Sequence, residues 1–152
     1  MSQTVLIIGG TGAQGVAVTK ILTAEGNYNV KVLTRDASSS HAKDIASIPN
    51  ISTIEGDPHN EPDLASALEG VDVVFVNHNG FAIGPMREMF WGVRTFELAR
   101  RAGVKHFVYG GLEYLGDITD YQEKYRVGHY YGKGVVGGSL PSSQLQDDLI
   151  DS

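Results

Sequence analysis

Apolar residues along the chain gather in short runs with little polar alternation. The first run, Val-Leu-Ile-Ile at residues 5–8, is typical of a strand that is buried on both faces of a parallel sheet. Comparable runs of varying strength follow, and together they predict strands at residues 5–8, 29–35, 51–56, 71–76 and 104–109.

Helix-compatible segments separate these runs, at residues 16–25, 40–48, 60–70 and 85–102. Ser40 and Asn60 are candidate N-caps of the second and third helix. In the longest helix, a stripe at helical spacing is expected to face the core, namely Met89, Val93, Phe96 and Ala99. Regular alternation of strand and helix predicts an α/β fold of the Rossmann type, with a parallel sheet of about five strands in the order 3-2-1-4-5.

Three regularly spaced glycines follow the first predicted strand. Gly10, Gly12 and Gly15 have the spacing of the dinucleotide-binding fingerprint. Glycines permit a sharp turn and close approach of a ligand, and the N-terminus of the next helix offers unpaired N–H groups to a pyrophosphate. The whole turn is therefore a candidate cofactor contact: Gly9, Gly10, Thr11, Gly12, Ala13, Gln14 and Gly15. A glycine-rich turn without a ligand is the alternative.

Arg35 ends the second predicted strand, 20 residues after Gly15. NAD-binding folds place an acidic residue near this position, which binds the ribose 2′-hydroxyl. A guanidinium instead makes paired, charge-assisted hydrogen bonds to a 2′-phosphate. We therefore expect NADP (NADPH) as the cofactor, with weaker binding of NAD. The alternative is a solvated surface arginine, and the adjacent Asp36 would either repel a phosphate or hold Arg35 in place.

The ends of the third and fourth predicted strands carry further candidates. Asp57 would either hydrogen-bond the adenine amino group or cap the next turn. His78 and Asn79 are expected beside the glycine turn, at the switch point where open α/β sheets bind ligands. Both are candidate cofactor contacts, although a lone histidine in a loop more often has a structural role or is solvated.

Composition and charge narrow the classes of partner. The 152 residues suggest one domain, and 41% hydrophobic with 20% charged residues is typical of a globular protein. A net charge of −6 argues against direct binding to nucleic acid. The sequence contains no cysteine, and we expect no disulfide and no metal site. Without a secretion signal or an apolar run of the roughly 20 residues that span a bilayer, we expect a cytoplasmic protein that does not bind membranes.

Several segments together resemble the NmrA-like family of atypical short-chain dehydrogenase relatives. They are Gly-Gly-Thr-Gly-Ala-Gln-Gly at 9–15, Val-Leu-Thr-Arg-Asp at 32–36, Glu-Gly-Asp at 55–57 and Ala-Gly-Val-Lys-His-Phe-Val-Tyr at 102–109. The resemblance covers about residues 3–135. It implies a Rossmann domain that binds NAD(P), followed by a smaller C-terminal subdomain. Family members include redox sensors that bind transcription factors or other regulators, which leaves a nuclear location open, and reductases of specialised metabolism.

Residues 128–133 bear on the chemistry. Catalytic short-chain dehydrogenases use Tyr-x-x-x-Lys, in which the lysine lowers the pKa of the tyrosine and the tyrosine exchanges a proton with the substrate. The resemblance places His129 at the tyrosine position and Lys133 at the lysine position, as in NmrA-like regulators. Both are candidate catalytic residues, and Lys133 is also a candidate contact of the nicotinamide ribose. Gly110 or Gly111 stands where a helper serine is usual, which favours a sensor over a dehydrogenase.

Three functional hypotheses follow. The first is an NADP(H)-binding redox sensor that regulates through a protein partner, and the second is an NADP-dependent oxidoreductase. The third is a truncated, inactive product, because relatives are considerably longer and the family pattern ends after Lys133. We expect the Rossmann domain at residues 1–136 and a disordered acidic tail at 137–152, because glycines and Pro141 break the last helix. The fifth strand would then leave an open edge, which favours self-association.

Overall fold

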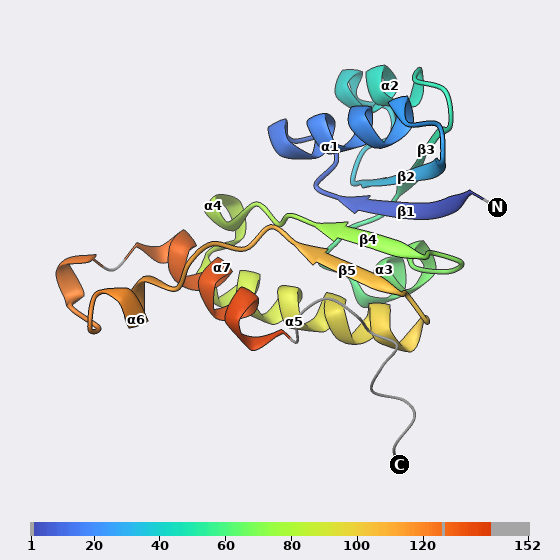
Figure 1. Ribbon diagram of the computed structural model, residues 1–152. Coiled ribbons are helices and arrows are strands. Elements are labelled where there is room, and N and C mark those ends of the chain that lie inside the picture. Colours follow the sequence, from blue (N-terminus) through green and yellow to red (C-terminus); the bar gives the residue numbers. More distant parts are fainter. Residues whose placement is uncertain (1, 126, 141–152) are drawn as a thin grey trace, which may run out of the picture.

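A computed structural model describes residues 2–125 and 127–140, which form one parallel sheet with helices on both faces (Figure 1). The strand order is β3-β2-β1-β4-β5, and all four neighbouring pairs are parallel. The strands are β1 (Gln3–Ile8), β2 (Tyr28–Thr34), β3 (Ile51–Glu55), β4 (Val73–Val76) and β5 (His106–Tyr109). The predicted α/β fold and strand order are therefore confirmed.

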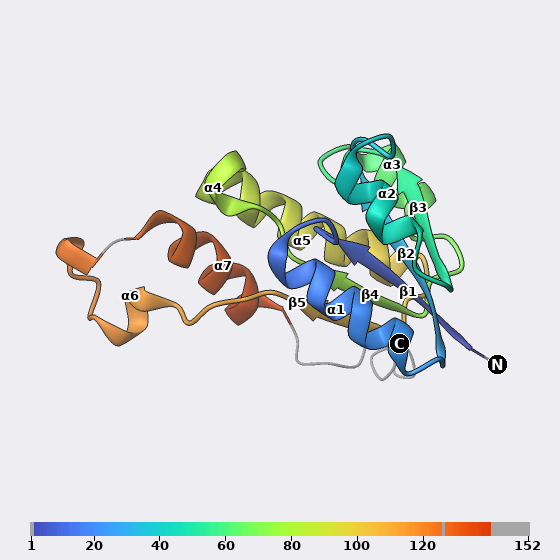
Figure 2. The same cartoon turned by 90° about the horizontal axis from the view of Figure 1, so that it is seen from above.

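Side chains of the strands alternate between two apolar cores. One core contains Val5, Ile7, Val30 and Val32 and lies under α1 (Ala13–Ala24) and α2 (Ser40–Ala46). The other contains Leu6, Ile8, Val74 and Val76 and lies under α3 (Glu61–Ala67) and α5 (Pro85–Arg101). Figures 1 and 2 show these two helical layers on opposite faces of the sheet. Burial on both faces explains why the central strands carry continuous apolar runs.

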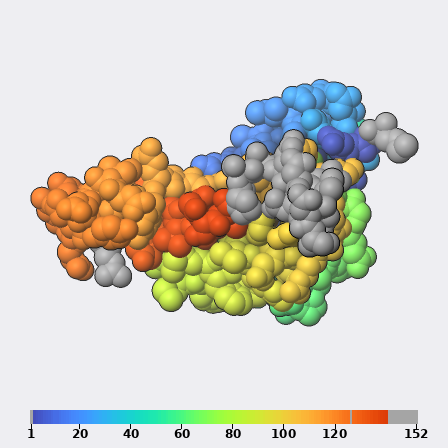
Figure 3. Space-filling model, turned by 60° about the horizontal axis from the view of Figure 1, so that its bottom comes forward, coloured from blue at the N-terminus to red at the C-terminus, as the bar shows by residue number. Residues whose placement is uncertain are grey.

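Four shorter or later elements complete the described chain: α4 (Gly80–Ile83), α6 (Leu115–Ile118), η1 (Glu123–Tyr125) and α7 (Gly128–Ser139). The segment with α6 and η1 follows β5 and projects beyond the carboxyl ends of the strands (Figures 1 and 3). Helix α7 returns along α5, where a Cβ at Gly92 would lie 2.8 Å from both methyl groups of Val136. The chain thereby brings Lys133 back to the sheet.

The buried face of α5 differs from the predicted stripe. Val93 is 39% exposed, whereas the fully buried positions include Glu88, Gly92 and Thr95. The actual stripe begins one residue earlier than the predicted one. Ala99 of the predicted stripe is fully buried, as expected, and Leu98 is buried beside it. Hydrophobicity could not reveal the earlier part of this face, because a charged, a glycine and a hydroxyl residue occupy it.

Two predictions about helix ends also need correction. Ser39, not Ser40, is the N-cap of α2, and its hydroxyl accepts a hydrogen bond from Ala42 N–H at 3.3 Å. The glycines after Lys133 do not end the last helix: α7 continues to Ser139, three residues past the expected domain boundary at 136. Gly134 is required there, because its Cβ would lie 2.7 Å from Tyr114 Cα. Of the expected tail, residues 141–152 lie outside the described residues.

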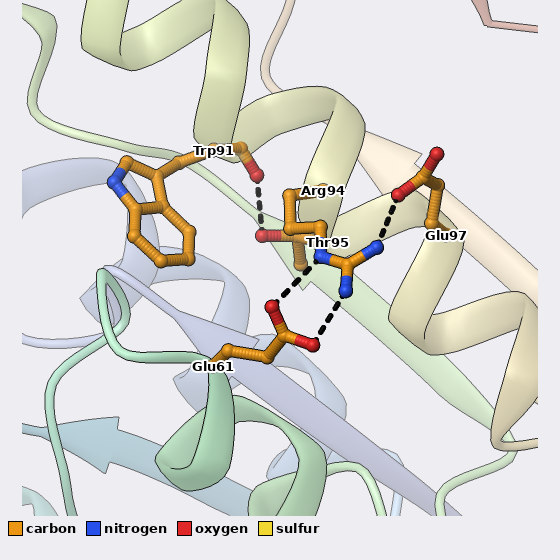
Figure 4. A network of polar contacts seen from close by, with 5 residues as sticks. All are labelled: Glu61, Trp91, Arg94, Thr95 and Glu97. Atoms are coloured by element: carbon orange, nitrogen blue, oxygen red, sulfur yellow. Dashed lines mark hydrogen bonds and ion pairs between the residues drawn. The ribbon is translucent and has the colours of Figure 1, made fainter.

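An ion-pair fork joins α3 to α5 on the surface (Figure 4). The Arg94 guanidinium donates to both oxygens of Glu61 and, through Nη1, to Glu97 Oε2 at 2.6 Å. These carboxylates raise the pKa of Arg94 further above its ordinary value. In the part of the chain that the structure describes, no helix has the length and apolar character needed to cross a membrane.

Candidate dinucleotide site

The glycine turn lies between β1 and α1 and leaves no room for a side chain at Gly9 or Gly15. Gly9 has a φ of 84°, and a Cβ there would lie 2.3 Å from the Asn77 carbonyl oxygen. A Cβ at Gly15 would lie 2.2 Å from the Gly9 carbonyl oxygen, so α1 packs directly on the turn. No side chain caps α1, and Gly12 to Gln14 are exposed at its start. The Gly12 N–H donates to the Gly9 carbonyl oxygen at 3.0 Å, whereas the first N–H groups of an α-helix have no acceptor within the helix, which suits an anionic ligand.

Asn77, the first residue after β4, connects this turn to α7. Its Nδ2 donates to Gln14 Oε1 at 2.9 Å, and its Oδ1 accepts from Lys133 Nζ at 2.9 Å. Lys133 Nζ also donates to the His78 carbonyl oxygen at 3.2 Å and lies 3.0 Å from Glu88 Oε1. The structure therefore brings Gln14 and Lys133, both candidate contacts, to one place. Sequence reasoning singled out neither Asn77 nor Glu88.

Arg35 lies exposed just beyond β2 and forms no ion pair with any residue that the structure describes. Asp36 does not hold it in place. The Asp36 carboxylate instead accepts hydrogen bonds from the Ser38 hydroxyl at 2.6 Å and from the Ser38 N–H at 2.8 Å. These bonds hold the pKa of Asp36 below its ordinary value. The Arg35 guanidinium is accordingly available to a ligand.

Asp57 lies beyond β3, next to a cluster of three aromatic rings that includes His59. Asp57 Oδ1 accepts from the His59 backbone N–H at 2.8 Å, so the carboxylate does stabilise the following turn. Its side chain remains 49% exposed, and a contact with adenine is still available to it. The His59 ring lies 5.2 Å from that of His78 and 5.8 Å from that of Trp91, measured between centroids.

His78 is buried rather than exposed to a cleft. Its side chain is 4% exposed, and neither ring nitrogen has a hydrogen-bond partner among the described residues. Burial lowers the pKa of His78 to about 3, with further contributions from His59 and Lys133. Alternation along β4 explains this position: His78 follows Val74 and Val76 toward α5, whereas Asn77 points toward α1. The same period of two, extended past the strand, could have indicated Asn77 as the residue beside the turn.

The remaining candidates have distinct positions. Asn79 is exposed and is the N-cap of α4, where its Oδ1 accepts from Ala82 N–H at 3.3 Å. His129 lies one helical turn before Lys133, and its ring is 4.4 Å from that of Phe81, between centroids. No hydrogen bond joins His129 to Lys133 in the described part of the chain.

Comparison with known proteins places this arrangement in a family. Residues 1–144 match the model of the NmrA-like family. An NmrA-like family domain-containing protein of Dictyostelium discoideum is 30% identical over 113 residues, or 72% of this chain and 36% of that protein. The NmrA-like family domain-containing oxidoreductase malD of Malbranchea aurantiaca is 31% identical over 165 residues, or 97% of this chain and 49% of malD. The chain thus spans less than half the length of these relatives.

Solved structures share the fold. NmrA, a negative transcriptional regulator solved in complex with NADP, superposes with a TM-score of 0.74 at 22% identity over 90% of this chain and 41% of NmrA. A short-chain dehydrogenase/reductase of Veillonella parvula in complex with NADP gives a TM-score of 0.70 at 15% identity, over 91% of this chain and 63% of that one. Together, the match over residues 1–144 and the Rossmann architecture show that the chain belongs to the NmrA-like family.

Proposed function

We propose that this protein binds NADP(H) across the carboxyl ends of β1, β2 and β4 and acts as a cofactor-responsive regulator through a protein partner. The glycine turn carries the proposal, because Gly9 and Gly15 let its backbone pack so closely that α1 begins directly against the turn, where its first N–H groups would meet a pyrophosphate. The solved NmrA, a regulator in complex with NADP, supports both parts of the proposal.

Each candidate residue has a place in this proposal. Residues 9–15 would hold the pyrophosphate, and the exposed Arg35 would bind the 2′-phosphate. The exposed part of Asp57 would meet the adenine. Asn79 and the backbone around His78 would border the central ribose. Lys133 would contact the nicotinamide ribose, with a ribose hydroxyl replacing one of its present hydrogen-bond acceptors. The cofactor, when bound, would supply a nicotinamide capable of hydride transfer.

The residues near Lys133 favour regulation over reduction of a substrate. His129 packs on Phe81 instead of pairing with Lys133, and Gly110 offers no hydroxyl. The nearby Tyr109 is no substitute, because burial, with a contribution from Glu88, raises the pKa of its hydroxyl far above neutral pH. A proton relay of the Tyr-x-x-x-Lys kind is therefore absent from the described residues.

The cofactor proposal is tested by titrating the chain with NADPH and with NADH, followed by nicotinamide fluorescence. We expect tighter binding of NADPH. An Arg35→Ala variant should lose about tenfold to a hundredfold in NADPH affinity, the equivalent of charge-assisted hydrogen bonds to one phosphate, with little change for NADH. Arg100→Ala, on the exposed side of α5, is the matched control and should bind as the parent does. Equal affinity for both cofactors in the parent would refute the assignment of Arg35.

An NADP-dependent oxidoreductase is the second candidate function. One observation favours it: His129 lies on α7 one turn from Lys133, where a proton donor would be required. The relatives named oxidoreductases, such as malD, agree with it. NADPH consumption with a panel of carbonyl substrates separates the two functions. Turnover by the parent that disappears in His129→Phe would favour the oxidoreductase over the regulator. Cofactor binding without turnover would support the regulator. Failure to bind either cofactor would favour the inactive product.

A further inference from the structure

Glu88 is a fully buried carboxylate next to Lys133. It lies on the inner face of α5 with 0% of its surface exposed. Its Oε1 lies 3.0 Å from Lys133 Nζ, and the lysine side chain itself is only 12% exposed. An isolated buried carboxylate is strongly disfavoured, so the ammonium of Lys133 is what permits a charge at this position.

The backbone around Glu88 is shaped to hold the carboxylate in one place. A Cβ at Gly80 would lie 2.1 Å from Glu88 Oε2, and one at Gly132 would lie 2.9 Å from the same oxygen. These glycines belong to α4 and α7, so three helices meet at the carboxylate. Close packing on both sides leaves the Glu88 side chain little freedom to follow Lys133 if the lysine moves.

The Lys133 ammonium lies among three oxygens. It donates hydrogen bonds to Asn77 Oδ1 at 2.9 Å and to the His78 carbonyl oxygen at 3.2 Å, and it forms an ion pair with Glu88 Oε1 at 3.0 Å. Glu88 is the only one of the three that carries a charge. It therefore fixes the ammonium against the other two, both of which belong to the loop after β4.

Asn77 connects Lys133 to the glycine turn. With Oδ1 occupied by Lys133, its Nδ2 is oriented toward Gln14 Oε1 at 2.9 Å. Its side chain is further confined by Gly110, where a Cβ would lie 3.0 Å from Asn77 Oδ1. Gln14 stands in the exposed first turn of α1, at the start of the helix that faces the ligand.

We propose that Glu88 is a positioning residue of the dinucleotide site, which acts through Lys133 and Asn77 to fix Gln14 and the glycine turn. This inference deepens the proposed function and rests on it where cofactor affinity is concerned. The turn and α7 are distant in sequence, and Glu88 joins them without contacting the ligand.

The test compares Glu88→Gln, which keeps the shape and removes the charge, with Glu97→Gln as a matched control. Glu97 is a carboxylate of the same helix that is paired with an arginine, but it is exposed. In the absence of cofactor, the NMR signals of the Asn77 and Gln14 side-chain amides should shift in E88Q and stay unchanged in E97Q. NADPH affinity should fall about tenfold in E88Q only, as expected when a hydrogen-bonded contact is no longer held in place. The melting temperature of E88Q should fall by about 10 °C, because a buried ammonium loses its counter-charge.

A lower melting temperature with unchanged amide signals and unchanged affinity would overturn the proposal, since Glu88 would then have a purely structural role. If E88Q does not fold, Glu88→Met with Lys133→Met removes the buried charges together and should melt near the parent temperature. Lys133→Met alone already removes the hydrogen bond to Asn77, so it is the reference for this double variant. If Glu88 acts through Lys133, the two variants should give the same Asn77 and Gln14 signals, and a further shift in the double variant would overturn the proposal. Because the NMR comparison needs no cofactor, a parent chain that fails to bind NADPH would refute the proposed function without deciding the role of Glu88.

Discussion

At the scale of single residues, the protonation of His78 makes the stability of the folded state depend on pH. It is buried with a pKa of about 3, whereas an unfolded chain gives histidine a pKa near 6.5. Between these values the unfolded chain binds a proton that the folded chain does not, so stability falls as the pH falls. The neighbouring His59 has a pKa lowered in the same direction, mainly by its burial.

We predict that lowering the pH from 7.5 to 5.5 costs about 1.4 kcal/mol of unfolding free energy through His78 alone. Urea unfolding at a series of pH values measures this slope. His78→Phe removes the titrating group and keeps an aromatic ring at this buried position. The variant should show a shallower slope, and a slope equal to that of the parent would assign the pH dependence to other groups.

At the scale of elements, the contact of α7 with its surroundings depends on where each glycine lies. Gly134 packs against the backbone of Tyr114, with 2.7 Å between its hypothetical Cβ and Tyr114 Cα. Gly138, one turn later, has open space around it. Both lie within the helix, so the cost of glycine in a helix applies to both, and only the packing differs.

We predict opposite effects of the same substitution at these two positions. Gly138→Ala should raise the unfolding free energy by about 0.5 to 1 kcal/mol, because alanine favours the helix and meets no neighbour. Gly134→Ala should lower it by about 1 to 3 kcal/mol, because backbone atoms cannot give way to the new methyl group. Thermal melts followed by circular dichroism compare the pair. Equal effects at both positions would show that α7 does not pack as described.

The element scale also shows what the sequence could and could not predict. Runs such as Val5 to Ile8 indicated the sheet, because burial on both faces leaves a direct trace in hydrophobicity. The inner face of α5 left no such trace before Leu98, since Glu88, Gly92 and Thr95 are buried through pairing and close approach. The glycines of α7 suggested an end to the helix, yet one of them serves its packing. Positions defined by a partner distant in sequence, such as Asn77 beside Gln14, need the fold before they can be recognised.

At the scale of the whole molecule, the described chain assembles the sheet and the glycine turn. The chain spans 36% and 49% of the length of the two relatives compared above. An activity of such a longer protein is therefore a proposal when it is assigned to this chain. Strand β5 is an edge strand among the described residues, with Val108 47% exposed. Self-association through this edge stays a prediction, as do a regulatory protein partner, the lack of direct nucleic-acid binding and the cytoplasmic or nuclear location.

The central claim is that a dinucleotide lies at the carboxyl edge of the sheet with its pyrophosphate on the glycine turn. Backbone NMR spectra of the 152-residue chain with and without saturating NADPH test it directly. The account predicts the largest shifts at the N–H groups of Gly10, Ala13 and Gln14, and none at Gly70 and Gly103, which precede β4 and β5 at the opposite edge. Shifts centred on that opposite edge, or none in the turn at saturation, would contradict the account.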